Sequence, residues 1–216
     1  MSYDIPYNAQ PKDGLHSTAY RKFYENFFVD ATGLIRHEVD LDFINALTRP
    51  EIELAKDLIR RNLKLQYVHI IEGVAALQDH ELVPQLREMF TQERDLSRKL
   101  TIAGTLWKLE KDPIFPECLG EMTKSDNDSL KVAHIHQTAW LGDERTIYFL
   151  IDIFQGGYGL ARHLAISMLN EIEDKRSYLG SDLPHPEKHY LALKEDKVFM
   201  EKMVKNLNEW YNKIAA

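Results

Sequence analysis

Apolar side chains recur at steps of three and four residues along most of the chain, and several of these stretches end in an aspartate. The aspartates are Asp79, Asp112, Asp143 and Asp174, separated by 33, 31 and 31 residues. This interval accommodates two helices of about 12 residues with short turns, and it is too short for a strand–helix–strand unit. The pattern predicts repeated helical hairpins.

Aligning the chain on these aspartates, with one residue inserted before Asp112, shows that the second helix of each hairpin shares three apolar positions. The first position holds Leu77, Leu109, Leu141 and Ile172; the second, Val74, Leu106, Thr138 and Leu169; the third, Ile71, Ala103, Ile135 and Ile166. The first helices carry stripes of their own, formed by Val83, Leu86 and Phe90, by Phe115, Leu119 and Met122, and by Ile147, Leu150 and Phe154. Steps of three and four place each stripe on one helix face, where it packs against its neighbours.

Polar turns separate the two predicted helices of each hairpin, at residues 91–95, 124–128 and 155–159. Aspartates and a Gly-Gly pair in these turns suit helix caps and breaks. Such short connections are typical of antiparallel helix pairs.

The stretch from Asp79 to Asp174 resembles HEAT repeats of the short bacterial type found in phycobilin-lyase-like proteins. The resemblance rests on Leu82-Val83-Pro84-Gln85-Leu86 and Phe115-Pro116 in first helices, and on basic residues that open second helices, namely Arg98 or Lys99, Lys131 and Arg162. Three units fit this pattern and residues 50–79 make a weaker fourth. The resemblance implies an all-α class, an α-α superhelix with a right-handed solenoid course and helical caps at both ends.

The expected organisation is a single domain over residues 1–216. Residues 14–48 form an N-terminal helical cap, in which residues 15–28 make an amphipathic aromatic helix. Residues 49–174 form about four helix pairs. Residues 175–216 form a loop at 177–186 and a capping helix at about 187–214, because the outer faces of terminal repeats need covers.

The third unit departs from the repeat pattern. His134 and Thr138 occupy positions where the pattern prefers alanine and an aliphatic residue, and Trp140 replaces a small or polar residue. Free drift of repeats where packing allows it accounts for such departures. The spacing of the apolar positions also predicts that His134 is buried and that His136 faces outward.

Composition describes a soluble globular chain, with 44% hydrophobic and 28% charged residues. Apolar stretches such as residues 147–154 are far shorter than a membrane span, and residues 1–12 lack the features of a secretory signal. We therefore expect a cytoplasmic protein without membrane contact. The 34 acidic and 27 basic residues give a net charge of −7, which disfavours nucleic acid and favours a basic protein partner. Cys118, the single cysteine, is expected in the core.

Candidate metal ligands do not converge in the sequence. His37-Glu38 and His80-Glu81 are similar to the His-Glu pairs of deoxyhypusine hydroxylases, a HEAT-repeat family that holds two irons, but the equivalent pairs at aligned positions are missing. His134 and His136 point to different sides of a helix, and His185 and His189 lie beside Pro186 without a third ligand. We expect no metal and no other cofactor.

No catalytic group is predicted either. The sequence Gly156-Gly157-Tyr158-Gly159 follows a helix and lacks the Lys-Ser/Thr of a phosphate loop, so it is interpreted as a turn between paired helices.

The second-helix surfaces that packing leaves free are the predicted binding face, since stacked helix pairs present these surfaces on the concave side. By alignment this face contains Glu72, Lys108, His136, Trp140 and Glu171. Trp140 is the preferred anchor, because an aromatic side chain on such a face contributes strongly to binding. Packing of Trp140 against a neighbouring repeat is the alternative.

The leading hypothesis is a protein–protein interaction module of immunity or adaptor type. One alternative is a HEAT-fold enzyme, either a metal-dependent hydroxylase, a lyase or a glycosylase of the alkylpurine-DNA type. The glycosylase requires a basic groove, which the net charge disfavours. A structural homo-oligomer that stacks through its end helices is a third possibility.

Overall fold

The computed structural model describes residues 3–31, 41–173, 197–198, 201–202 and 204–205. All regular secondary structure within these ranges is helical, which confirms the predicted all-α class. The chain divides into two compact units, Met1–Asp112 and Pro113–Ala216, and the division falls at one of the repeat aspartates. Asp174 and the loop predicted at residues 177–186 lie outside the described residues. Of the predicted last helix, only the described positions from 197 to 205 are known, and they are helical.

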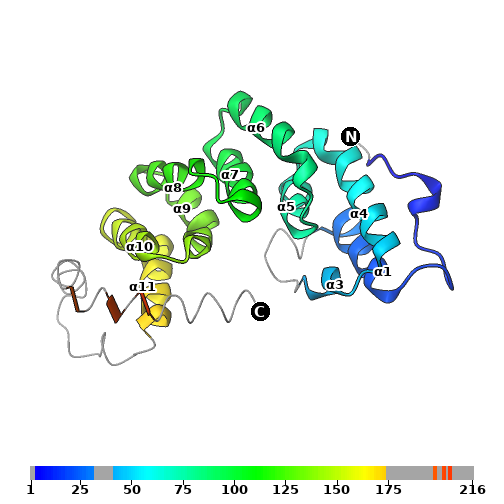
Figure 1. The fold of residues 1–216 in the computed structure, drawn as a ribbon. Coiled ribbons are helices and arrows are strands. Elements are labelled where there is room, and N and C mark those ends of the chain that lie inside the picture. The colour runs from blue at the N-terminus through cyan, green and yellow to red at the C-terminus, as the bar shows by residue number, and fades with distance from the viewer. Residues whose placement is uncertain (1–2, 32–40, 174–196, 199–200, 203, 206–216) are drawn as a thin grey trace. The chain divides into compact units, whose positions relative to one another are not determined.

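The first unit contains an N-terminal cap followed by two antiparallel helix pairs (Figure 1). The cap consists of α1 (Thr18–Tyr24), the π-helix Glu25–Val29 and α3 (Asp42–Asn45). The pairs are α4 (Arg49–Asn62) with α5 (Val68–Ala76), and α6 (Val83–Gln92) with α7 (Leu96–Glu110). The second helices α5 and α7 pack on each other, as expected for stacked pairs.

The second unit repeats this arrangement. Its pairs are α8 (Ile114–Lys124) with α9 (Asp128–His134) and the following 3-10 helix Ile135–Leu141, and then α10 (Glu144–Gly156) with α11 (Gly159–Glu173). First helix α8 packs on first helix α10, and second helix α9 packs on second helix α11. Each predicted turn therefore lies between the two helices of one pair, as the sequence pattern indicated.

Burial confirms the apolar positions on which the repeats were aligned. In the second helices all of these residues are buried except Leu109 and Ile166, which are half-buried. In the first helices only Phe90 is half-buried, and the others are buried. Cys118 and His134 are buried and His136 is exposed, also as predicted. The core is therefore the set of residues that the period of three and four selected.

A left-handed residue precedes each described repeat aspartate. Gln78, Lys111 and Gly142 have φ angles of 50°, 57° and 69°. A left-handed residue at this position ends a helix by turning the chain away from the helix axis. The aspartate that follows is thereby placed at the junction with the next helix, which explains why it recurs along the sequence.

Asp79 and Asp112 are buried, and each forms an ion pair with an arginine of the first helix of its own pair. Arg60 Nη2 lies 2.6 Å from Asp79 Oδ1, and Arg87 Nη1 lies 2.6 Å from Asp112 Oδ2. Helix α8 has no arginine, and Asp143 instead caps α10 by accepting a hydrogen bond from the Arg145 backbone N–H (2.9 Å). Among the described repeat aspartates, Asp79 and Asp112 of the first unit thus close their own helix pairs with an ion pair, whereas Asp143 pairs with Arg145 of the following helix.

The third helix pair is irregular where the sequence departs from the repeat. Its second helix is an α-helix up to His134 and a 3-10 helix from Ile135 to Leu141. Runs of 3-10 helix longer than three or four residues are uncommon. Thr138 takes part in this irregular backbone, since its hydroxyl donates to the Ile135 carbonyl (2.7 Å) and its carbonyl accepts from the Thr146 hydroxyl (2.7 Å).

The predicted aromatic cap helix is shorter than expected. It begins at Thr18 because Ser17 caps it, accepting a hydrogen bond from the Tyr20 backbone N–H (3.1 Å), and Leu15 is exposed outside it. After Tyr24 the helix continues as the π-helix rather than as an α-helix. The predicted helix over residues 15–28 therefore begins three residues late and continues to Val29 with a change to π geometry, because apolar spacing cannot distinguish a cap or a π-turn from a regular helix.

Close approach of three helices in the first unit depends on Gly73 of α5. A Cβ atom at this position would lie 2.8 Å from Cδ1 of Ile59 on α4 and 2.8 Å from Cε1 of Phe27 on the π-helix. The absence of a side chain therefore allows α5 to contact the cap and its own partner helix at once.

Candidate functional site

Glu72 and Lys108 are the two predicted binding residues that the structure brings together. They lie on the adjacent second helices α5 and α7, and their charges interact. Desolvation by the surrounding protein lowers the pKa of Lys108, and the negative charge of Glu72 acts in the opposite direction. The Lys108 side chain is nevertheless exposed and Glu72 is half-buried, so solvent screens this interaction. The pair forms a mixed-charge surface across two helices.

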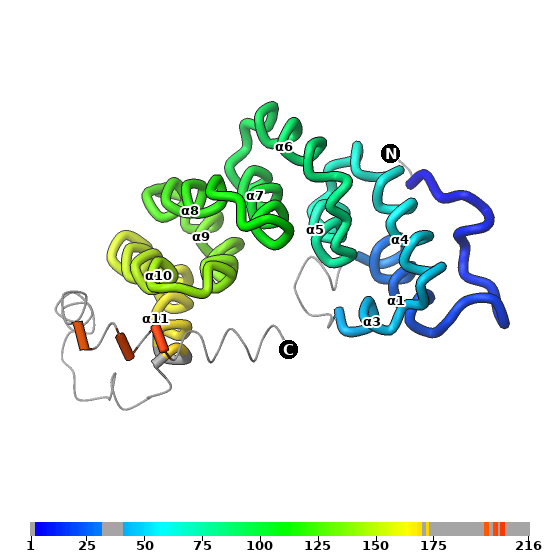
Figure 2. The backbone as a smooth tube through the Cα atoms, in the orientation of Figure 1, coloured from blue at the N-terminus to red at the C-terminus, as the bar shows by residue number. Residues whose placement is uncertain are grey.

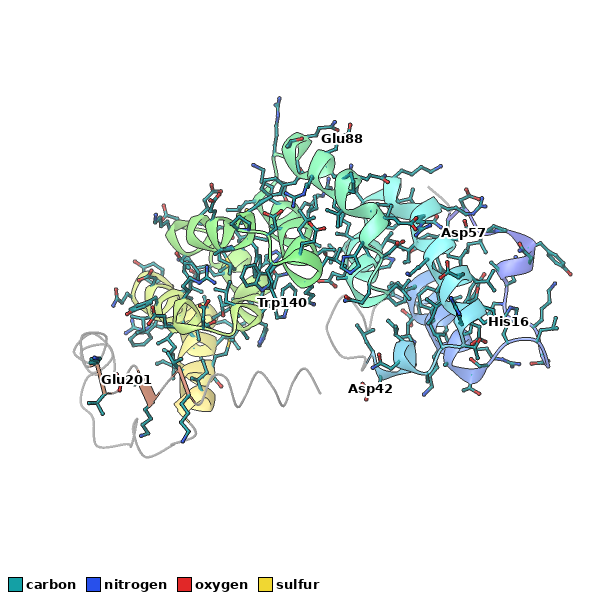
Figure 3. The ribbon with its side chains drawn as sticks, viewed as in Figure 1. His16, Asp42, Asp57, Glu88, Trp140 and Glu201 are labelled. Carbon is teal, nitrogen blue, oxygen red and sulfur yellow. The ribbon has the colours of Figure 1, made fainter. Side chains whose placement is uncertain are left out.

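Trp140 packs against the first helix of its own pair. Its ring stacks on Phe115 of α8, with ring centroids 5.8 Å apart and an interplanar angle of 26°. The side chain is also half-buried rather than fully enclosed. Figure 3 labels Trp140, which belongs to the 3-10 helix of the third pair. The indole therefore packs inside its own unit and keeps part of its surface exposed.

His136 is exposed and belongs to the same 3-10 helix as Trp140. The two residues are four apart, which places them about 40° from each other around an α-helix. In the observed 3-10 helix, with three residues per turn, four positions correspond to about 120°. The observed helix type therefore corresponds to a wider angular spacing of His136 and Trp140 than the α-helix that the alignment assumed.

Glu171 belongs to α11, and its side chain lies outside the described residues. Glu72 and Lys108 belong to the first unit, whereas His136 and Trp140 belong to the second. A single face formed by all five residues remains a prediction.

The sequence did not reveal a cluster of aromatic residues around His69 at the start of α5. The Tyr3 hydroxyl and His69 Nε2 are 3.0 Å apart. Tyr67 stacks on the imidazole at 5.7 Å between centroids, and Phe28 meets the Tyr3 ring edge-on at 5.2 Å. His69 is 5% exposed, so the ring lies inside the cluster.

Burial affects the ionisation of both Tyr3 and His69. Burial lowers the pKa of His69, and the backbone of Phe27 acts in the opposite direction. Burial raises the pKa of Tyr3, and Tyr67 adds to this effect. Both shifts favour the neutral side chains, so the Tyr3 hydroxyl and His69 Nε2 form a hydrogen bond between uncharged groups.

Asn62, the last residue of α4, holds the main chain of the neighbouring Asp4. Its Oδ1 accepts from the Asp4 backbone N–H (2.7 Å), and its Nδ2 donates to the Asp4 carbonyl (3.1 Å) and to the Leu58 carbonyl (2.8 Å). The side chain is completely buried. The sequence shows a polar residue, Asn62, at a core position of a helix, and a non-helical segment near residue 4. Neither feature indicates that Asn62 contacts this segment.

In the second unit, the glycine-rich turn is a structural junction, as predicted. Lys131 is buried and donates from Nζ to the Gly156 carbonyl at the end of α10 (3.1 Å). Asp128 accepts from the Tyr158 backbone N–H just before α11 (2.9 Å). A cation at a helix C-terminus and a carboxylate at a helix N-terminus are both favourable, so these residues stabilise the turn.

No group of three or more His, Cys, Asp or Glu side chains among the described residues is arranged to hold a metal ion. His37, Glu38, His185 and His189 lie outside the described residues. In the part of the chain that is described, no helix is at once long and apolar enough to cross a membrane.

No family model, curated protein or solved structure matches this chain. The resemblance to HEAT repeats and the functions that it implies therefore remain predictions.

Proposed function

We propose that the chain is a helical-repeat module that binds a protein partner through the exposed surfaces of its second helices. The observation that carries this proposal is the pairing of Glu72 with Lys108 across α5 and α7. Two oppositely charged groups on adjacent helices offer directional contacts to a partner, and exposed charges of this kind contribute mainly to specificity and to the rate of association.

The aromatic side chain of the second unit supports the same proposal. Aromatic residues that are partly buried in their own protein are already restricted in conformation, so binding costs them little entropy. Trp140 meets this condition, since it stacks on Phe115 and retains exposed surface. The net charge of −7 favours a partner of opposite sign. An immunity or adaptor role is a specific form of this proposal.

Affinity capture with the full-length chain tests the proposal. The bait would be compared with the variants Lys108→Glu and Trp140→Ala, with captured proteins quantified by mass spectrometry. We expect one protein, recovered in near-stoichiometric amount, to decrease at least about tenfold with each variant, because loss of an interface anchor costs about 2 kcal/mol.

Lys124→Glu is the matched control for the charge reversal, because Lys124 is exposed on the first helix α8. Equal recovery with wild type and all variants, or an equal decrease with the control, would contradict binding through the second helices. Circular dichroism of each bait would verify that the variants are folded.

A further inference from the structure

The N-terminal segment of the first unit is attached to α4 and α5 by contacts that resemble recognition of a peptide ligand. Figure 2 shows this segment in dark blue, running along the outside of α4 before it reaches α1. Asp57, labelled in Figure 3, belongs to the same helix. Among residues 3–10, Ala9 is buried, whereas Asp4, Tyr7, Asn8 and Gln10 are exposed. The segment therefore lies on the surface rather than within the core.

Asn62 recognises the main chain of this segment and not its side chains. Its amide accepts from the N–H of Asp4 and donates to the carbonyl of the same residue. A carboxamide that contacts both groups of one residue selects an extended or turned backbone irrespective of sequence. Asn62 has no exposed surface, so leaving its amide without these partners would cost free energy.

Two neighbouring contacts involve the side chains of Tyr3 and Asp4. The Tyr3 hydroxyl forms a hydrogen bond with His69 Nε2, and the Tyr3 ring packs edge-on against Phe28 and Tyr67. The Asp4 carboxylate lies 4.0 Å from Arg61, which also pairs with Asp57. The surface thus contacts a tyrosine through its ring and hydroxyl, and the acidic residue that follows it through one exposed charge at 4.0 Å.

We propose that the surface formed by Asn62, His69, Tyr67, Phe28 and Arg61 is a peptide-binding site, which the chain's own Tyr3-Asp4 occupies and which accepts a partner segment of the same chemistry in its place. The partner segment is non-helical and carries a tyrosine followed by an acidic residue. This site is separate from the second-helix surfaces and does not depend on the function proposed for them.

The chain's own segment competes with a partner segment for the site. A segment tethered to its site competes at an effective concentration in the millimolar range, so a free peptide binds weakly unless the tethered one is released. Weakening the internal contacts therefore increases the apparent affinity for a peptide. A purely structural clamp would show no such gain, since it has no separable ligand.

The test measures binding of a fluorescein-labelled synthetic peptide that copies residues 2–6 to the full-length chain, by fluorescence anisotropy. Two variants of the full-length chain weaken the contacts of its own segment and are called the release variants. Tyr3→Ala removes the ring and its hydroxyl, and Asp4→Pro removes the backbone N–H that donates a hydrogen bond to Asn62. We expect each folded variant to bind the peptide at least about tenfold more tightly than the wild type.

Peptide variants keep the test independent of protein folding. A peptide with N-methyl aspartate in place of the aspartate lacks the backbone N–H that donates to Asn62. A peptide with phenylalanine in place of the tyrosine lacks the hydroxyl that forms a hydrogen bond with His69. We expect weaker binding of both, with the larger loss for the N-methyl peptide, because Asn62 is the more deeply buried partner.

Lys64→Ala, combined with Tyr3→Ala, is the matched control, since Lys64 is exposed just after α4. It should bind the peptide as Tyr3→Ala does. Absence of peptide binding to both folded release variants, equal affinity for the wild type and the release variants, or equal binding of the N-methyl peptide would each overturn the proposal.

Discussion

Arg60 and Asp79 form a two-point ion pair, in which Nε lies 2.6 Å from Oδ2 and Nη2 lies 2.6 Å from Oδ1. The carboxylate is almost fully buried, with 2% of its side chain exposed, whereas the guanidinium is 33% exposed and also contacts Glu81 (2.9 Å). The parallel geometry of a guanidinium and a carboxylate gives the strongest hydrogen bonds between charged side chains. The contact joins the first helix of the pair to the end of its second helix.

Removal of the arginine is expected to destabilise the first unit by about 2–3 kcal/mol, because it leaves a buried carboxylate without its cation. Urea unfolding of Arg60→Ala, followed by circular dichroism, would measure this. The neighbouring Arg61→Ala is the control: its ion pair with Asp57 is exposed, so its loss should be clearly smaller. Similar midpoints for the two variants would show that the Asp79 contact contributes little.

The Glu51 carboxylate should make stability depend on pH. It accepts from the N–H and hydroxyl of Ser17 (2.6 and 2.9 Å) and of Thr48 (2.9 and 2.8 Å), and so links the N-terminal caps of α1 and α4. Burial raises the pKa of Glu51, but these hydrogen bonds outweigh burial and lower the pKa from 4.5 to about 2. A lowered pKa in the folded state means that the stabilisation is complete above about pH 4.5 and is lost as pH falls towards 2.

Glu51→Gln tests this dependence. At pH 7 the variant should lose up to about 3 kcal/mol of unfolding free energy relative to wild type, and the difference should shrink as the pH is lowered from 5 to 3. Denaturant unfolding at several pH values would measure it. Glu53→Gln, on the exposed side of the same helix, should give a small difference with no such trend. A constant difference for Glu51→Gln over this range would contradict the assignment.

Two glycines within helices should respond in opposite directions to the same substitution. Gly73→Ala should destabilise the chain by about 1–3 kcal/mol, because the new Cβ meets Ile59 and Phe27 at 2.8 Å. Gly120→Ala in α8 should stabilise it by up to about 1 kcal/mol, because the nearest side-chain atom, on Phe149, is at an ordinary contact distance of 3.8 Å. Thermal unfolding of both variants would reveal the signs. A stabilising Gly73→Ala would mean that α5 has room to move.

Local periodicity predicted the parts of the fold that depend on neighbours in the sequence. The helix pairs, their turns and the buried positions follow from residues three and four apart, such as Ile71 and Val74. The capping box of Thr48 and Glu51 was also present in the sequence as Thr-x-x-Glu, although it gives no sign that Ser17 joins it. Contacts between distant segments had no such signal: Tyr3 and His69 are 66 residues apart.

The candidate site was predicted only in part for the same reason. Alignment of α-helices placed Glu72 and Lys108 on adjacent second helices correctly. It assumed an α-helix for the segment that contains His136 and Trp140, whereas residues Ile135–Leu141 form a 3-10 helix. The polar and small residues of that segment hinted at an irregularity without specifying its geometry.

The 3-10 helix in the third pair also affects the length of its repeat. Helix α7 has 15 residues and rises about 22 Å, whereas α9 and the 3-10 helix, with 7 residues each, together rise about 24 Å. The shorter segment therefore reaches at least as far as the longer one. A deletion within a second helix therefore need not shorten the helical segment, because a 3-10 helix has a larger rise per residue than an α-helix.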